Sequence, residues 1–420
     1  MFDKDILCAL SGGGFRATFF HAGVLRSLIR LGLKDRIKVV SSVSGGSIVN
    51  ALFGLNFDNI NTVDDFDRVI IAPLIEFSCK NPRNSIVNHQ MLAFLNRIVA
   101  GIGATVSPVG NPLSFFKTRQ SSELFIEQMD EYIFKGKTLK DLSKNLRVVI
   151  NATNLNNGAR FRFDNTDFGD YKLGYSYGID HMPISHAVMA SACFPGLFAP
   201  FKLDLRQHQF YLRDKNKTDS SNPNMVPNQV YLSDGGIYDN LGYFSIDSEL
   251  KRGKNGFVLI SDAANRFCNT DESYGLLNSI FRIKDILMEQ VSNRDRNKIV
   301  DNLLDKKWSG VYFKLENSCR WYRNYKHEKC PDAPILPEFG LSDSVVNRIA
   351  QIRTDLNKFS EMEIKCLVHH GETLAETSIA KWHNQDYVAL RDSKEYSLLT
   401  DLGCSEDKIY NGLNSSHKLF

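Results

Sequence analysis

Short apolar runs alternate with longer segments of helical periodicity in the first part of the chain. Asp5 to Leu10 is an apolar run, and Arg16 to Leu31 then repeats apolar residues at the spacing of a helix. The same order recurs at once, because Lys38 to Val43 is rich in β-branched residues and Ile48 to Leu55 again has helical spacing. Strands that alternate with helices are typical of a mainly parallel sheet covered by helices on both faces. The pattern therefore predicts a three-layer α/β fold.

The series of predicted strands continues well beyond this first part. Ile184 to Ala192 is a short predicted helix within the same region. Four further runs have the composition of strands, namely Arg147–Thr153, Ala159–Phe163, Val230–Leu232 and Gly256–Ser261. We therefore assign residues 5–265 to one α/β core.

Helical patterns dominate the last third of the chain. They surround a single predicted strand, Val311 to Leu315. We interpret residues 266–420 as a mostly helical extension packed on the core. The sequence leaves open whether this extension is a cap over the site or a regulatory element.

An apolar segment within residues 62–135 is a second region of interest. These residues are predicted to be mostly helical, and Met91 to Ile102 presents a wide apolar face. A loop rich in glycine and proline follows and ends at Phe115 and Phe116. Core helices and a groove or lid for acyl chains both fit this pattern. The pattern alone leaves both interpretations open.

The composition is that of a globular protein. The 420 residues are 43% apolar and 24% charged, which excludes a disordered or fibrous chain. Lysine and arginine number 51 against 48 acidic residues, so we expect no nucleic acid polymer as the main partner. The first residues lack the apolar run of a signal peptide, and no segment has the ~18 apolar residues that span a bilayer. We expect a cytoplasmic protein, for which any contact with membranes is peripheral.

The spacing of the cysteines argues against a metal cofactor. The 8 cysteines include no CxxC pair, and we interpret them as reduced thiols. Cys319, His327 and Cys330 form a loose group that lacks the second close pair of ligands found in zinc sites. We therefore expect neither a metal nor another cofactor.

Ser44 has the sequence context of a nucleophile. It lies between a predicted strand and a predicted helix, and a serine in such a sharp turn has its hydroxyl exposed above the sheet. Ser42-Val43-Ser44-Gly45-Gly46 matches the pattern G-x-S-x-G at the serine and at the last glycine, with serine at the first glycine position. Alone, this match is weak, because turns of serine and glycine after strands are common.

A glycine loop, Gly12 to Gly14, follows the first predicted strand. Such a loop lets backbone N–H groups approach an oxyanion without side-chain obstruction, as acyl transfer requires. Gly12-x-Gly14-x-x-Ala17 also satisfies the dinucleotide fingerprint G-x-G-x-x-G/A. That fingerprint expects an acidic residue at the end of the second strand, where this chain has Val43-Ser44-Gly45. A nucleotide-binding sensor or a non-catalytic module that uses the Gly12–Gly14 loop therefore stays open as the alternative function.

Asp234 ends a predicted strand in a Ser-Asp-Gly-Gly turn. A serine nucleophile needs a base, and the small neighbours Gly235 and Gly236 would let a substrate approach the carboxylate. An ordinary Asp-Gly turn fits the same residues. Separation along the chain is no objection to the pairing with Ser44, because folding assembles catalytic groups from distant segments.

Together, these segments resemble the patatin-like phospholipase family, in its bacterial form. The resemblance rests on Gly12-Gly13-Gly14-Phe15-Arg16, on Ser44 and on Asp234-Gly235-Gly236, in that order. A fourth segment, Ala190 to Pro195, is similar to the proline-bearing segment of the family. The resemblance covers residues 5–265, and Ser42 departs from the elbow pattern of the family.

The resemblance implies a Ser/Asp dyad without a catalytic histidine. Asp234 would remove the proton of Ser44, which would then attack a lipid ester. The N–H groups that would hold the oxyanion are those of Gly12, Gly13, Gly14 and Gly45. The supporting residues would be Arg16, Gly46, Gly235 and Gly236, with Arg16 orienting the loop or meeting a phosphate.

A histidine triad is the alternative to the dyad. The histidines that follow Asp234, in the order used by α/β-hydrolases, are His327, His369, His370, His383 and His417. We interpret Asp239, in the same region as Asp234, as a residue that shapes the turn.

The family resemblance also implies a membrane substrate. We expect a phospholipase that acts on membrane phospholipids from the cytoplasm, at the inner face of the membrane. The apolar face of Met91 to Ile102, with Phe115 and Phe116, is then the candidate for contact with lipid. Some bacterial members are effectors of antiphage defence that cyclic nucleotides switch on, and residues 266–420 would be the place for such a switch. No residue there identifies a nucleotide site, and the sequence leaves oligomerisation open.

Overall fold

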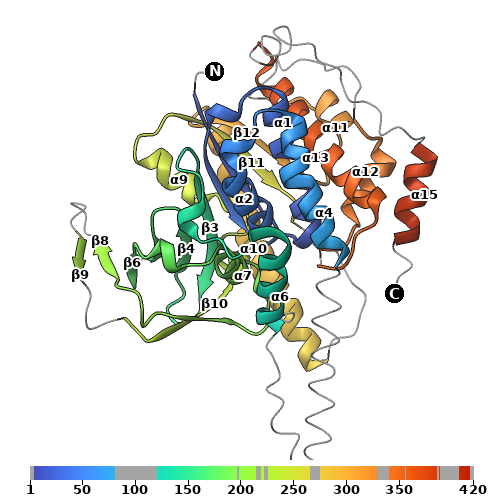
Figure 1. Ribbon diagram of the computed structural model, residues 1–420. Helices are drawn as coiled ribbons and strands as arrows, with labels where there is room; N and C mark the ends of the chain where they lie inside the picture. Colours follow the sequence, from blue (N-terminus) through green and yellow to red (C-terminus); the bar gives the residue numbers. More distant parts are fainter. Residues whose placement is uncertain are drawn as a thin grey trace, which may run out of the picture.

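A 12-stranded sheet lies at the centre of the computed structural model (Figure 1). The structure describes residues 4–80, 121–195, 198–213, 219–221, 226–264, 275–328, 340–354, 356–385, 387 and 406–416. Parallel strands form one side of the sheet, which begins at its edge with β12 (Ser309–Lys314) and continues with β11 (Gly256–Asp262), β1 (Asp5–Leu10), β2 (Ile37–Val43) and β3 (Arg147–Asn154). The predicted α/β fold with a mainly parallel central sheet is therefore confirmed.

Short antiparallel strands extend the sheet beyond β3. They are β4 (Arg160–Asp164), β5 (Phe168–Asp170), β6 (Gly174–Ser176), β8 (Tyr211–Arg213) and β9 (Asp219–Ser221), while β10 (Gln229–Asp234) pairs with β3 and with β7 (Phe201–Asp204). Four of these strands, β5, β6, β8 and β9, have 3 residues each. The sequence predicted strands at the positions of β4 and β10. It did not predict the four short strands, because three residues are too few for an alternation of polar and apolar positions to be recognised.

Helices cover both faces of the sheet. One face carries α1 (Gly14–Arg30), α2 (Gly45–Asn56), α7 (Ile184–Ala192) and α13 (Glu361–Trp382), and the other carries α9 (Phe244–Lys251) and α10 (Leu276–Leu304). The other α-helices of the described residues are α3 (Val63–Phe66), α4 (Ala72–Cys79), α6 (Ser121–Met129), α8 (Gly236–Asp239), α11 (Cys319–Asn324), α12 (Asp343–Ala350) and α15 (Glu406–Ser416). The three predicted layers are present.

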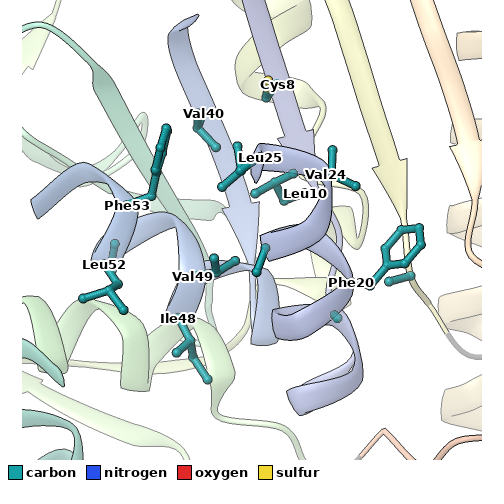
Figure 2. Close-up of a cluster of buried hydrophobic side chains, with 14 of the residues drawn as sticks. Cys8, Leu10, Phe20, Val24, Leu25, Val40, Ile48, Val49, Leu52 and Phe53 are labelled. Carbon is teal, nitrogen blue, oxygen red and sulfur yellow. The ribbon is translucent and has the colours of Figure 1, made fainter. Parts of the chain in front are cut away.

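Side chains of β1 alternate between the two faces. Ile6, Cys8 and Leu10 belong to the core under α1 and α2, and Figure 2 shows Cys8 and Leu10 among the side chains of these helices. Leu7 and Ala9 belong to a second core under α9 and α10. Successive residues of a strand point to opposite faces, so a strand buried on both faces reads as a continuous apolar run. This is why β1 was recognisable in the sequence.

The segment expected to contact lipid is described only in part. Within residues 62–135 the described residues include α3, α4 and α6. Met91–Ile102 and Phe115–Phe116 lie outside the described residues. Among the helices that the structure does describe, none combines the length and the apolar character that crossing a bilayer requires.

The C-terminal part of the chain contributes to the same sheet and layers. β12 is parallel to β11, and α13 lies directly against α1. Each helix has a glycine where it crosses the other. A Cβ atom at Gly371 of α13 would lie 2.0 Å from the carbonyl oxygen of Phe20, and one at Gly23 of α1 would lie 1.9 Å from the carbonyl oxygen of Val368. The two backbones are therefore in contact, which larger residues would prevent.

Buried ion pairs cross the same interface. Arg26 of α1 donates to Asp67 and to Glu372 of α13, and Arg30 pairs with Glu376. Glu372 and Glu376 are 2% and 1% exposed. Burial raises the pKa of Glu376 to about 7, although the charge of Arg30 opposes this rise. Because an unpaired charge in such a place is costly, these pairs hold α1 and α13 in one relative position.

We expect Gly371→Ala to lower the free energy of unfolding by at least about 1–3 kcal/mol, the usual cost of overpacking, because the new methyl group would overlap the backbone of α1. Gly275→Ala is the matched control, since a Cβ atom there meets nothing within 4 Å. Thermal unfolding of both variants tests this, and equal midpoints would contradict the backbone contact.

Candidate active site

Ser44 occupies a strained turn between β2 and α2. Its backbone angles are φ 52° and ψ −123°, a conformation that costs a residue with a side chain on the order of 1–3 kcal/mol. The residue is half-buried, whereas Val43 and Gly45 on either side are buried. Ser44 faces the glycine loop, because a Cβ atom at Gly12 would lie 3.3 Å from the Cβ of Ser44. This is the geometry of a nucleophile placed between a strand and a helix.

Ser191 of α7 holds the turn in place. Its Oγ accepts the backbone N–H of Ser44 at 2.9 Å and donates to the carbonyl oxygen of Asn151 at 2.6 Å. The hydroxyl of Ser47 lies 2.9 Å from the same Oγ. Ser191 belongs to the segment Ala190–Pro195 that the sequence singled out, but the sequence did not assign it this role.

Ser42 fits without disturbing the turn, although it replaces the glycine of the elbow pattern. Its Oγ accepts a hydrogen bond from Nδ2 of Asn50 at 2.8 Å and lies 3.0 Å from Oγ of Ser47. Ser42 is fully buried. Its hydroxyl therefore has partners on α2, and the departure from the pattern is accommodated.

Two strands bring Ser44 and Asp234 together from opposite directions along one edge of β3. β2 is parallel to β3 and ends with Val43 beside Asn151, and β10 is antiparallel and ends with Asp234 beside Ala152. β4 occupies the other edge of β3. Asn151 and Ala152 are consecutive, so the ends of β2 and β10 meet. The sheet thus joins two residues that are far apart in the chain.

Asp234 is a buried carboxylate with a raised pKa. Its Oδ1 accepts the N–H of Gly236 at 2.7 Å, and Thr153 donates to its backbone carbonyl. Burial raises the pKa of Asp234 to about 6, and the N–H of Gly236, the Ser44 side chain and the charge of Lys284 on α10 act against this rise. The contact with Ser44 lacks the geometry of a full hydrogen bond, because the buried Oδ2 has no such partner in the described part of the chain. Catalytic hydrogen bonds are often long before substrate binds.

The glycine loop presents backbone donors beside Ser44. The N–H of Gly12 donates to the carbonyl oxygen of Asn240 at 3.0 Å, so this group is already used. Gly13 and Gly14 have φ angles of 141° and 56°, which glycine adopts without strain. Within the described residues, the N–H groups of Gly13, Gly14 and Gly45 have no protein acceptor. These three groups are available to an anion.

Close backbone contacts position the loops of the site. A Cβ atom at Gly45 would lie 2.0 Å from the carbonyl oxygen of Gly14, and one at Gly235 would lie 2.3 Å from that of Asn151. Two further glycines of the sequence motifs have close neighbours. A Cβ atom at Gly46 would lie 2.7 Å from the carbonyl oxygen of Ser11, and one at Gly236 would lie 2.7 Å from the side-chain Oδ1 of Asn240. The glycines therefore let the turns approach one another.

Arg16 anchors the glycine loop to the C-terminal part of the chain. Its guanidinium donates to the carbonyl oxygens of Ile352 at 3.0 Å and Ala263 at 2.9 Å, and the residue is 1% exposed. The carbonyl oxygen of Ala263 would lie 2.8 Å from a Cβ atom at Gly13. Of the two roles expected for Arg16, these contacts favour orientation of the loop over contact with a phosphate.

Three other groups that could act as a base in place of Asp234, namely Asp239, His370 and His383, have partners of their own. Asp239 is buried, and its Oδ2 accepts the N–H of Phe244 at 2.9 Å, as expected for a residue that shapes the turn. His370 and His383 lie 2.7 Å and 3.0 Å from the backbone carbonyl oxygens of Leu315 and Gly310. In the described part of the chain, no histidine is among the groups that act on Asp234. His417 lies outside the described residues.

Metal ligands do not gather near this site. Among the residues that the structure describes, no group of three or more histidine, cysteine or acidic side chains is arranged to hold a metal ion. Cys319 of the loose cysteine and histidine group is buried and packs against Gly340, and Cys330 is not described.

The fold and the site define a class of α/β proteins that carry a serine between strand and helix beside a buried carboxylate. The family model described as Patatin-like phospholipase matches residues 8–245, more than half of the chain. The chain therefore belongs to the patatin-like phospholipase family, a family of lipid ester hydrolases. No curated protein matches its sequence.

Several solved structures are similar to this chain. Human GIVD cytosolic phospholipase A2 is 13% identical with a TM-score of 0.49, and the match covers 93% of this chain and 60% of the human one. Its complex with methyl gamma-linolenyl fluorophosphonate is 14% identical with a TM-score of 0.43, over 93% and 59% of the two chains. VipD from Legionella pneumophila is 14% identical with a TM-score of 0.33, over 93% and 67%. This chain thus spans 60% of the length of the human phospholipase chain.

We expect Asp234→Asn to stabilise the protein at pH 8 and not at pH 4. The pKa of Asp234 rises from 3.8 to about 6 on folding, so burial of the ionised carboxylate costs stability fully above about pH 6 and not below pH 3.8. An uncharged asparagine avoids this cost, which corresponds to about 1–3 kcal/mol. Denaturant unfolding of both proteins at the two pH values measures the gain. A gain of the same size at pH 4 would show that it has another cause.

Proposed function

We propose that this chain is a phospholipase that cleaves fatty-acyl esters of membrane phospholipids with a dyad of Ser44 and Asp234. The observation that supports the dyad most is the meeting of a serine in a strained turn with a buried carboxylate whose pKa responds to that serine. The family match supports a lipid ester as the substrate class.

In the proposed reaction, Oδ2 of Asp234 accepts the proton of the Ser44 hydroxyl while Oγ of Ser44 attacks the carbonyl carbon of the ester. The negative charge that develops on the carbonyl oxygen is held by the N–H groups of Gly13, Gly14 and Gly45, close to the N-terminus of α2. The alcohol leaves with the proton from Asp234, and an acyl-enzyme remains. Asp234 then takes a proton from the water that attacks the acyl group, and it returns this proton to Oγ of Ser44 as the fatty acid leaves.

This assignment modifies the expected oxyanion hole in one respect. The family resemblance implied that Gly12 is one of the donors, but its N–H donates to the backbone carbonyl oxygen of Asn240. Gly12 serves instead by lacking a side chain beside Ser44. The same contacts make a nucleotide-binding role for the Gly12–Gly14 loop less well supported, because the loop faces a serine and not the acidic residue that a ribose requires.

The place and the regulation of the reaction are further parts of the proposal. The enzyme would act from the cytoplasm on the inner face of the membrane, through peripheral contact. A cyclic nucleotide is the candidate activator, in antiphage defence. Both rest on the family resemblance. Residues 266–420 would carry the response to an activator.

Ser44→Ala and Asp234→Asn should each reduce the release of fatty acid from mixed phospholipid vesicles by about 10³-fold or more, because each removes one half of the dyad. The assay is run with and without a panel of cyclic nucleotides, and dependence on one of them would identify the activator. Asp239→Asn is the matched control for the carboxylate, since burial also raises the pKa of Asp239 to about 6. Ser344→Ala, on the exposed side of α12, is the control for the hydroxyl. Equal loss in Asp234→Asn and Asp239→Asn would argue against the dyad.

We expect kcat/KM on a soluble ester to rise with pH and to reach half its maximum near pH 6. Asp234 has to be ionised to accept the proton of Ser44, and its pKa is about 6, set by burial against the N–H of Gly236, the Ser44 side chain and Lys284. A pH series between 5 and 8 measures the acidic limb. A rate that stays constant over this range would exclude Asp234 as the base.

A further inference from the structure

The amino-terminal half of α10 carries exposed aliphatic side chains. Ile283, Ile286 and Leu287 are 55%, 40% and 61% exposed. Their spacing of three and four residues places them on one side of the helix. Towards the other end of α10, Ile299 is buried in the core beneath the sheet. In Figure 1, α10 runs past α6, and its lower end projects beyond the body of the molecule.

Lys284 connects this exposed face with the active site. Its Nζ lies 4.0 Å from the centre of the Phe194 ring, and Phe194 is 37% exposed. Phe194 follows Cys193, whose carbonyl oxygen accepts the N–H of Asp234 at 3.0 Å. The aliphatic face, the lysine with its aromatic partner, and the carboxylate therefore follow one another from the surface inwards.

We propose that Ile283, Lys284, Ile286, Leu287 and Phe194 form a surface, here called the α10 surface, that docks on a phospholipid bilayer. The aliphatic side chains enter the acyl layer, and Lys284 stays at the level of the phosphates and binds the phosphate of the lipid whose ester reaches Ser44. This inference rests on the proposed function and names the surface through which that site receives its substrate.

The chemistry of the α10 surface fits a bilayer. A phospholipid leaflet presents an apolar layer beneath a layer of phosphates, and the α10 surface presents aliphatic side chains bordered by a cation that faces the site. Long cationic side chains reach back to the phosphate level while neighbouring apolar groups are immersed. On this helix Nζ of Lys284 lies 3.1 Å from Oδ1 of Asp285, and Glu289 pairs with Arg296, so acidic side chains offset the cations. Binding therefore requires apolar contact and does not require anionic lipid.

The test of docking uses the full chain with Ser44→Ala, so that binding is measured without hydrolysis. We expect Ile283→Asp with Leu287→Asp to reduce binding to phosphatidylcholine vesicles at least tenfold in a flotation assay. Tyr171→Asp is the control, because Tyr171 is 65% exposed on the antiparallel side of the sheet. Unchanged binding in the double variant would overturn the proposal. Leu287→Ser alone, checked by its unfolding midpoint, should reduce binding without loss of the fold.

The test of phosphate recognition compares two substrates in the same vesicles, a phospholipid and the matching diacylglycerol, which lacks the phosphate. We expect Lys284→Gln to lower the preference for the phospholipid at least fivefold and Lys284→Arg to retain it. An unchanged preference in Lys284→Gln would overturn the role of Lys284. If the wild type releases no fatty acid, the proposed function fails, while the binding measurements still decide whether the α10 surface docks on lipid.

Discussion

The site depends on the way in which two strands share one edge of β3. β2 stops at Val43 beside Asn151, and β10 arrives from the opposite direction and stops at Asp234 beside Ala152. If β2 paired one residue further, Ser44 would belong to the ladder and its side chain would point to one face of the sheet. Because the ladder ends there, the chain turns sharply at Ser44, and the ends of β2 and β10 bring Ser44 and Asp234 to the same end of the sheet. A single constraint on strand length thus sets both the position and the strained backbone of Ser44.

Sequence reasoning found the parts of the site that lie directly after buried strands. The glycine loop, Ser44 and Asp234 each follow an apolar run, and small residues around them are visible in the sequence. The groups that hold these parts have no comparable signal. Ser191 and Asn240 act through one hydroxyl and one backbone carbonyl, and their importance comes from contacts between distant segments. Only the folded chain reveals such contacts.

The parallel strands of the α/β core were predictable for the same reason, but the three-residue antiparallel strands and the exposed face of α10 were not. β1 and β2 are buried on both faces, so their apolar runs identify them. The antiparallel strands beyond β3 are short and depend on pairing partners that periodicity does not report. Ile283, Ile286 and Leu287 have the spacing of an ordinary buried helix face, and only their exposure in the structure distinguishes them from one.

In the proposed dyad, Asp234 combines a cost in stability with a gain in reactivity. Burial raises its pKa to about 6, which makes the carboxylate a stronger base than an exposed aspartate and still leaves it mostly ionised near neutral pH. Lys284 opposes a larger rise, and it belongs to α10, outside the residues that match the family model. A residue of the C-terminal part therefore influences the pKa of the carboxylate at the candidate site. A charge that acts in this way has to be held at a fixed distance, because its effect falls as the distance grows. β12, which pairs with β11, and α13, which packs against α1, join the C-terminal part to the same sheet that carries Asp234.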